Sequence, residues 1–287
     1  MSAKKHTLLL AGCGALAQQV GAQLAGSDWV LHGLRRNPQG LPSWIRPAAV
    51  DLLAADCPQS WPQGQLDYVL VTLTADERSE QAYRRTYLQA QRNLYRWLAQ
   101  HGQQPGQLIF VSSTAVYGQD AGQWIDEQSP AMPQRWSGRI MLKAEQLAQE
   151  SGIPSTVVRL AGIYGGGRQA FLQRVRDGYH AGGCLNRYTN RIHEADAAAL
   201  LAHLLQLVAA GNQLAPVYLG VDDCPVEQHE VVQWLQQQLA VQGREGCVLG
   251  KAGSSKRCSN ALARSTGWQP RYAEFRQGYL ELIRAGA

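Results

Sequence analysis

A glycine-rich turn close to the amino terminus is the first segment of the chain that could bind a ligand. Gly12, Gly14 and Ala17 lie in the segment LLLAGCGALAQQV, where they follow an apolar stretch and open an amphipathic one. Gly12 permits a tight turn, Gly14 lets the main chain approach a pyrophosphate, and Ala17 allows close helix packing. The N-terminus of the following helix faces the anion. A purely structural turn is the alternative. The residues expected to contact a dinucleotide here are Gly12, Cys13, Gly14, Ala15 and Leu16.

The end of the second expected strand indicates which dinucleotide the turn would favour. In NAD-binding folds, a carboxylate about 20 residues after the first glycine binds the ribose hydroxyls. That position falls at His32 here, and residues 32–36 contain no carboxylate but do contain Arg35 and Arg36. Because guanidinium groups pair with phosphates, we expect either arginine to contact a 2′-phosphate and NADP to be preferred over NAD. The alternative is that both are solvated loop charges.

These residues require a parallel sheet to position them, and the sequence predicts one. Apolar segments of strand length alternate with helix-period stretches over the first two thirds of the chain, which is typical of βαβ units. The expected strands are 6–11, 29–34, 48–52, 67–73, 107–112 and 155–160, and the clearest expected helices are 15–24, 77–100 and 138–150. The expected fold class is α/β: a doubly wound parallel sheet, the Rossmann fold, with a smaller C-terminal α+β substrate-binding region.

The last third of the chain is organised differently. Glycine-rich loops precede a helical segment at 194–210, a strand at 216–220, a helix at 226–240 and a polar tail that ends in 272–284. We expect residues 1–160 plus 194–213 to form the dinucleotide-binding domain. Residues 161–193 plus 214–287 are expected to form the smaller substrate-binding region.

Composition narrows the classes of function. The 287 residues carry 27 Lys and Arg against 22 Asp and Glu, a net charge of +5, without a basic cluster. We therefore expect no nucleic-acid partner. No apolar run approaches the ~18 residues of a membrane span, so no membrane partner is expected. The six cysteines show no CxxC pair or metal spacing, which indicates reduced thiols in a cytoplasmic protein without a metal site.

Six motifs occur in order along nearly the whole chain. They are AGCGALA, VDLLAAD, FVSSTAVYG, RLAGIYGGGR, NRIHEADAAALL and SKRCSNALARSTGWQPRY. In this order they resemble the extended short-chain dehydrogenase/reductases, the NAD-dependent epimerase/dehydratase family, and most closely its atypical members. The resemblance implies a small-molecule substrate, in most members a nucleotide sugar. It also implies a homodimer through the helices at 77–100 and 138–150. The apolar stripe suited to that interface, or to packing on the sheet, consists of Tyr83, Tyr87, Leu94 and Trp97.

The resemblance also implies roles for residues outside the glycine turn. Ser113, four residues before Tyr117, matches the Ser or Thr that hydrogen-bonds the substrate. The residues matched to the cofactor are Asp51, Leu52, Thr72, Leu73, Thr74, Ser112, Leu160, Gly162 and Ile163. Those matched to the substrate are Tyr164, Arg168, Asn190, Arg191 and His193. Arg168 or Arg191 would suit the diphosphate of such a substrate.

The catalytic pair of the resembled family is missing. Family enzymes use a YxxxK helix, in which the ammonium lowers the phenol pKa so that the phenol exchanges a proton with the substrate. None of the 11 tyrosines is followed four residues later by lysine. One alignment places Arg139 and Lys143 at the two positions, and another places Ser137 and Met141 there. The second alignment is favoured, because the helical phase places Arg139 and Lys143 on a polar stripe that is expected to face solvent.

Two functions follow from these observations. The first is an NADP(H)-dependent oxidoreductase, epimerase or dehydratase that acts on a nucleotide sugar or similar carbonyl compound with an atypical active site. Ser113 and Tyr117 are its candidate catalytic residues, and Tyr164 or His193 are alternatives. The second is a non-catalytic NADP(H)-binding sensor or interaction protein. Retention of Ser113 and the loop motifs favours the enzyme, whereas the missing pair favours the second function.

Overall fold

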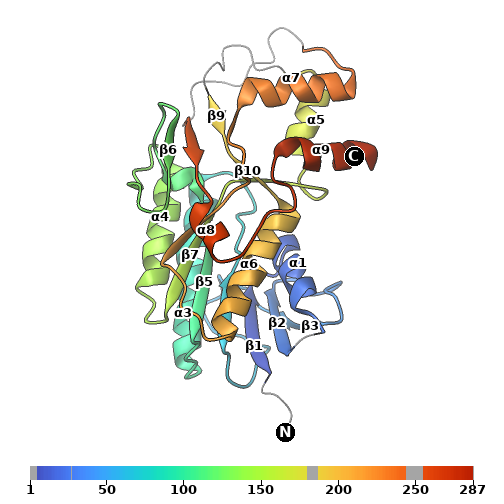
Figure 1. The fold of residues 1–287 in the computed structure, drawn as a ribbon. Helices are drawn as coiled ribbons and strands as arrows, with labels where there is room; N and C mark the ends of the chain where they lie inside the picture. Colours follow the sequence, from blue (N-terminus) through green and yellow to red (C-terminus); the bar gives the residue numbers. More distant parts are fainter. Residues whose placement is uncertain (1–4, 27, 180–186, 244–254, 287) are drawn as a thin grey trace. The chain divides into compact units, whose positions relative to one another are not determined.

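A computed structural model of the chain describes residues 5–26, 28–179, 187–243 and 255–286. Its central feature is a seven-stranded parallel sheet with the order β11-β7-β5-β4-β1-β2-β3 (Figure 1). The strands are β1 (His6–Ala11), β2 (Trp29–Arg35), β3 (Ile45–Ala49), β4 (Tyr68–Val71), β5 (Gln107–Ser113), β7 (Ser155–Leu160) and β11 (Val217–Gly220). The strand order reverses between β1 and β4, the place where doubly wound sheets bind ligands. The fold class predicted from the sequence is confirmed.

Runs of consecutive apolar residues explain the central strands. Leu8, Leu9 and Leu10 of β1 have no exposed surface, as expected for a strand covered on both faces. The edge strand β3 begins at Ile45 rather than at the predicted residue 48, and only its residues Ile45 and Ala48 are buried. Pro47 lacks an N–H group and is tolerated because β3 is at the edge. The apolar residues after Ala49 leave the sheet because β2 ends at Arg35.

Helices connect the strands of the sheet. They are α1 (Ala15–Leu24), α2 (Glu80–Tyr83), the π-helix η1 (Arg84–Gln89), α3 (Ala90–Gln100), the 3-10 turn η2 (Thr114–Val116), α4 (Trp136–Gln149) and α6 (Glu194–Ala209). The long helix predicted from residue 77 starts after Ser79, whose Oγ accepts a hydrogen bond from the Ala82 N–H at 3.1 Å. Leu94 and Trp97 are fully buried inside the chain. They therefore pack internally, and the expected homodimer stays a prediction.

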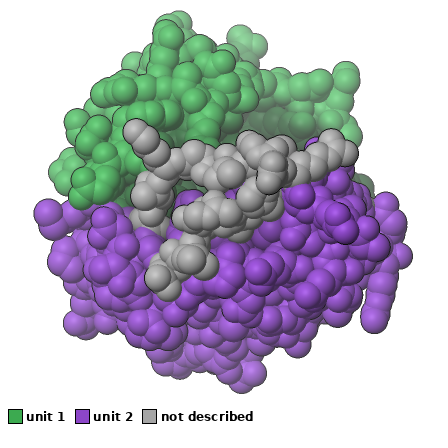
Figure 2. All heavy atoms as spheres, turned by 90° about the horizontal axis from the view of Figure 1, so that it is seen from above, with its two compact units in different colours: residues 1–116, 133–159, 198–218 green, residues 117–132, 160–197, 219–287 purple. Residues whose placement is uncertain are grey.

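The chain divides into two compact units, which are coloured separately in Figure 2. Unit 1 comprises residues 1–116, 133–159 and 198–218, and unit 2 comprises 117–132, 160–197 and 219–287. The domain boundaries expected from the sequence stay a prediction. Unit 2 contains strand pairs of two or three residues and short helices. They are β6 (Gln123–Ile125), β8 (Gly162–Tyr164), β9 (Tyr188–Thr189), β10 (Arg191–His193), β12 (Val226–Glu227), β13 (Lys256–Cys258), α5 (Ala170–Arg176), α7 (Gln228–Leu239), α8 (Ala261–Ser265) and α9 (Phe275–Arg284).

Within the described residues, every helix is too short or too polar to cross a bilayer. Cys13, Cys57, Cys224 and Cys258 are free thiols, and the other two cysteines lie outside the described residues. The described His, Cys, Asp and Glu side chains form no group of three that would hold a metal ion.

A buried ion pair joins α4 to the sheet. Arg159 of β7 contacts Glu145 of α4, with Nη2 2.6 Å from Oε2 and Nε 3.0 Å from Oε1. The Ser112 hydroxyl of β5 donates to the same carboxylate, at 2.5 Å from Oε1. The Arg159 and Glu145 side chains are only 7% and 2% exposed. The Glu145 carboxylate thereby links α4, β5 and β7 of unit 1, and both of its oxygens accept hydrogen bonds.

We expect Glu145→Gln to lower the free energy of unfolding by about 3–5 kcal/mol, because removing one partner leaves the other charge buried and uncompensated. Denaturant unfolding at neutral pH measures the loss. Glu150→Gln is the matched control, since Glu150 is exposed at the C-terminal end of the same helix. Equal losses in the two variants would contradict the structural role of the pair.

Candidate functional site

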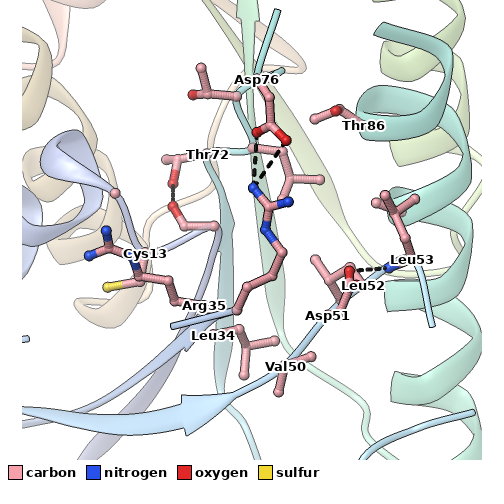
Figure 3. Close-up of a pocket in the computed structure, with 16 residues that line it drawn as sticks. Cys13, Leu34, Arg35, Val50, Asp51, Leu52, Leu53, Thr72, Asp76 and Thr86 are labelled. Carbon is pink, nitrogen blue, oxygen red and sulfur yellow. Dashed lines mark hydrogen bonds and ion pairs between the residues drawn. The ribbon is translucent and has the colours of Figure 1, made fainter. Parts of the chain in front are cut away.

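Unit 1 contains a cavity of about 230 Å³ at the carboxyl ends of β1, β2, β3 and β4 (Figure 3). Its wall consists of residues 12–14, 34–36, 50–53, 72–74 and 76, together with Thr86 and Ala90. Thr86 belongs to the π-helix η1, a distortion that often occurs at functional sites. The loops that follow four neighbouring strands therefore form a single cavity in this unit.

The glycine turn is shaped by close main-chain contacts. Gly12 has φ +84°, and a Cβ atom there would lie 3.0 Å from the Leu73 main-chain nitrogen. The Thr72 hydroxyl donates to the Gly12 carbonyl at 2.8 Å, which holds the turn against the end of β4. Gly14 caps α1 without a side chain, and the first turn of this described helix contains no acidic residue. The main-chain N–H groups at this helix end thus have no capping side chain and can bind an anion.

Charged side chains lie around this turn. Arg36 Nη2 lies 3.0 and 3.2 Å from the two carboxylate oxygens of Asp76, shown by dashed lines in Figure 3. The hydrogen bond and charge of Asp76 raise the pKa of Arg36, so the guanidinium stays charged. Asp51 Oδ1 accepts a hydrogen bond from the Leu53 N–H at 2.9 Å. Burial raises the pKa of the Cys13 thiol to about 11, although Arg35 opposes this shift.

Ten of the residues predicted for the cofactor lie together in the cavity wall. They are Gly12, Cys13, Gly14, Arg35, Arg36, Asp51, Leu52, Thr72, Leu73 and Thr74. Ala15 and Leu16 form the first turn of α1 instead. Ser112 does not line this cavity, because its hydroxyl donates to buried Glu145. Leu160, Gly162 and Ile163 belong to unit 2.

Sequence reasoning missed six residues of the wall. They are Leu34, Val50, Leu53, Asp76, Thr86 and Ala90. Asp76 is the most important omission because it is charged and binds Arg36. A carboxylate for the ribose hydroxyls is expected at the end of the second strand and Asp51 is expected after the third, whereas Asp76 follows the fourth. The position of Asp76 five residues after the end of β4 is the signal that would have identified it.

In unit 2, short parallel strands bring several predicted substrate residues together. The pairing of β8 with β10 places Tyr164 opposite His193, and their rings meet edge to face with centroids 5.2 Å apart. Tyr164 also stacks on Tyr279 at 4.5 Å. His193 Nδ1 accepts a hydrogen bond from the Ala195 N–H at 3.2 Å, and burial lowers its pKa. His193 is therefore a neutral ring at the start of α6.

A buried carboxyl that sequence analysis did not single out lies in the same unit. Asp222 is 2% exposed, and its main-chain N–H donates to the Arg191 carbonyl at 2.7 Å. Burial raises the pKa of Asp222 to about 8, while the charge of Arg191 acts in the opposite direction. Asp222 Oδ2, Arg191 Nη1 and the Tyr164 hydroxyl are buried without a hydrogen-bond partner in the described part of the chain. Buried polar atoms of this kind are expected to bind water or a ligand.

The other predicted catalytic and substrate residues have different surroundings. Tyr117 is 1% exposed and donates its hydroxyl to the Asp126 carbonyl at 2.9 Å. The Asn190 amide is engaged by β13: it donates to the Lys256 carbonyl at 3.0 Å and accepts from the Cys258 N–H at 2.8 Å. A substrate contact by either residue would require these bonds to be exchanged. Arg168 is exposed in the loop after β8.

The helix that would carry the missing pair has the predicted phase. Arg139 and Lys143 are exposed, whereas Met141 is 5% exposed and Ser137 is half-buried. Lys143 is thus a surface lysine. Ser113 is half-buried at the end of β5, and its Oγ accepts a hydrogen bond from the Ala115 N–H at 3.2 Å. This bond leaves the Ser113 O–H free to donate.

We expect the unfolding free energy to fall as the pH rises from about 4 to about 8, through Asp222. The unfolded carboxyl loses its proton near pH 4, while the folded one retains it to about pH 8, so the folded state binds more protons in that window. The slope from one such group is at most about 1.4 kcal/mol per pH unit. Asp222→Asn removes this component in denaturant unfolding, and Asp120→Asn, at an exposed position of unit 2, retains it. An unchanged slope in Asp222→Asn would show that this carboxyl is ionised throughout.

Comparison with known proteins places the chain in a family. Residues 5–241 match the family model of the RmlD substrate binding domain. Protein YeeZ of Escherichia coli (strain K12) is 27% identical over 214 residues, which cover 71% of this chain and 74% of that protein. A candidate NAD-dependent epimerase/dehydratase of Methylobacillus flagellatus is 28% identical, with a TM-score of 0.76 over 98% of both chains. MoeE5, solved with UDP-glucuronic acid and NAD, shares the fold at 19% identity, with a TM-score of 0.77 over 98% of this chain and all of that one. The chain belongs to the RmlD substrate binding domain family and is an atypical extended short-chain dehydrogenase/reductase with the epimerase/dehydratase fold.

Proposed function

We propose that the cavity of unit 1 binds the adenosine and pyrophosphate part of a nicotinamide dinucleotide. The observation that carries this proposal is the Gly12 turn. A Cβ atom at Gly12 would lie 3.0 Å from the Leu73 main-chain nitrogen, and the turn leads into the N-terminus of α1, which has no capping side chain. A side chain at Gly12 would fill the space where the main chain meets Leu73. The 230 Å³ of the cavity is below the ~300–1,000 Å³ of pockets for drug-sized ligands. The cavity therefore fits part of a dinucleotide.

The charged groups support NADP(H) as the preferred form. Arg35 and Arg36 both line the cavity, as a 2′-phosphate requires. The residues at the end of β2 offer no carboxylate to a free ribose hydroxyl. NAD(H) is the alternative cofactor, and MoeE5 was solved with NAD.

We further propose a reaction of the oxidoreductase, epimerase or dehydratase class on a nucleotide sugar or a similar carbonyl compound. Family membership supports this class, and MoeE5 was solved with the nucleotide sugar UDP-glucuronic acid. A nicotinamide cofactor supplies hydride transfer when bound. Ser113 contributes a hydroxyl that donates a hydrogen bond to a substrate oxygen. Tyr164, Arg168, Arg191 and His193 of unit 2 are the proposed substrate residues.

A non-catalytic role for the bound nucleotide is the second candidate. Met141 is buried and Lys143 is exposed on α4, so neither supplies an ammonium group beside a phenol. Loss of a general acid or base costs about 10²- to 10⁴-fold in rate. Turnover of UDP-glucuronic acid or UDP-glucose above background, and its loss in Ser113→Ala, would favour the enzyme. Nucleotide binding without turnover of any nucleotide sugar would favour a sensor.

We expect NADPH at 100 times its Kd to stabilise the wild-type protein by ~2.7 kcal/mol, and Gly12→Ala to abolish most of this stabilisation. The added Cβ would crowd Leu73 and disfavour the φ of +84°. Thermal unfolding with NADPH and NADH in parallel measures both effects. Gly64→Ala is the matched control: its φ is +88°, but a Cβ there meets no described atom within 4 Å. Absence of any shift in the wild type would refute nucleotide binding, and a full shift in Gly12→Ala would place the site elsewhere.

A further inference from the structure

The cavity of unit 1 is balanced in charge. Its wall contains two arginines, Arg35 and Arg36, and two carboxylates, Asp51 and Asp76. Arg36 is paired with Asp76 at 3.0 Å, and the charge of Asp51 also acts on Arg36. Arg36 is therefore not a free anion site. A ligand phosphate that approaches Arg36 meets a guanidinium already neutralised by a carboxylate.

The topology of the sheet explains why these two residues meet. Arg36 directly follows β2, Asp76 lies in the loop after β4, and β1 lies between β2 and β4 in the sheet. Strands two places apart are about 10 Å from each other, a gap that a loop and an arginine side chain can span. The ion pair thus bridges the two strand ends on either side of β1, from which the glycine turn emerges.

The two forms of a dinucleotide respond differently to such a pair. A 2′-phosphate carries a charge of about −1.5 to −2, so it must compete with Asp76 for Arg36 and is repelled by the carboxylate. A free 2′-hydroxyl is neutral and donates a hydrogen bond to a carboxylate. A carboxylate at this position therefore penalises the phosphate without penalising the hydroxyl.

We propose that Asp76 sets the discrimination between a ribose with a free 2′-hydroxyl and one with a 2′-phosphate. It takes the role that a carboxylate at the end of the second strand has in NAD-binding folds, and acts from the loop after β4. The preference for NADPH provided by Arg35 and Arg36 is reduced by Asp76 to a modest value. This inference rests on the proposed binding of a dinucleotide in this cavity.

The test measures the Kd of NADPH and of NADH by titration calorimetry for the wild type and for Asp76→Asn. An exposed ion pair contributes up to about 1 kcal/mol, or about 5-fold, and relief of phosphate repulsion adds to it. We expect the ratio of the NADH Kd to the NADPH Kd to rise about 3- to 10-fold in Asp76→Asn, mainly through tighter NADPH binding. Arg36→Gln should move the ratio in the opposite direction, and Asp76→Glu should keep it near the wild-type value.

Asp28→Asn is the control for the loss of one negative charge. Asp28 is exposed and precedes β2, so it lies at the opposite end of that strand from Arg36. The same titrations with 2′,5′-ADP and 5′-AMP, which lack nicotinamide, should reproduce the change in the ratio. Higher salt should reduce the change, because exposed charges are screened.

The outcomes separate this inference from the function on which it rests. If the wild type binds neither dinucleotide, the proposed function fails. If the wild type binds and the ratio in Asp76→Asn equals that in Asp28→Asn, the role of Asp76 is refuted while nucleotide binding stands. Because the Asp76 side chain is 68% exposed, we expect its substitution to leave the fold intact. Unchanged melting temperatures of the variants without ligand would show that they are folded.

Discussion

Strand β1 hydrogen-bonds to β2 on one side and to β4 on the other, with Leu10 aligned with Gly33 and with Leu70. Because all three strands are parallel, their carboxyl ends meet at one edge of the sheet. This pairing brings together the glycine turn, the arginines at the end of β2 and the loop after β4. Gly33 shows how tight it is, since a Cβ there would lie 2.7 Å from Ile45 Cγ2 and 2.9 Å from Cys13 Sγ. The candidate site depends on this packing more than on any single contact within it.

Two buried polar clusters, one in each unit, differ in how fully their atoms are hydrogen-bonded. In unit 1 the Glu145 carboxylate binds Arg159 and Ser112, and a satisfied network of this kind fixes the elements that carry it. In unit 2 the Asp222 carboxyl and Arg191 retain buried polar atoms without described partners. Such atoms cost free energy when left unpaired. The arrangement in unit 1 therefore suits a rigid frame, whereas that in unit 2 suits the binding of water or a polar ligand.

Much of the sheet could be predicted because its signals are local. Strand β1 and helix α1 have the predicted bounds, since an apolar run, two glycines and an amphipathic helix follow one another closely. The predicted bounds of β3 were wrong because Pro47 and the two exposed residues between Ile45 and Ala48 obscure a short edge strand. The strands of unit 2 contain only two or three residues, which is too few for a periodic pattern. Asp76 and Asp222 were missed for a different reason: each acts on an arginine far away in sequence, and only the topology brings them together.

The phase of α4 has consequences for chemistry. Glu145 is fixed in the interior by Arg159 and Ser112, so α4 cannot rotate to bring exposed Lys143 toward the sheet without exposing that ion pair. Lys143 therefore stays at the surface of the protein. Ser113 adjoins the anchored frame, because it follows Ser112 on β5. Its neighbour's hydrogen bond to Glu145 holds the strand end, while its own hydroxyl proton stays available. The same buried carboxylate thus keeps Lys143 on the exposed face of α4 and holds Ser112, the neighbour of the proposed substrate residue Ser113.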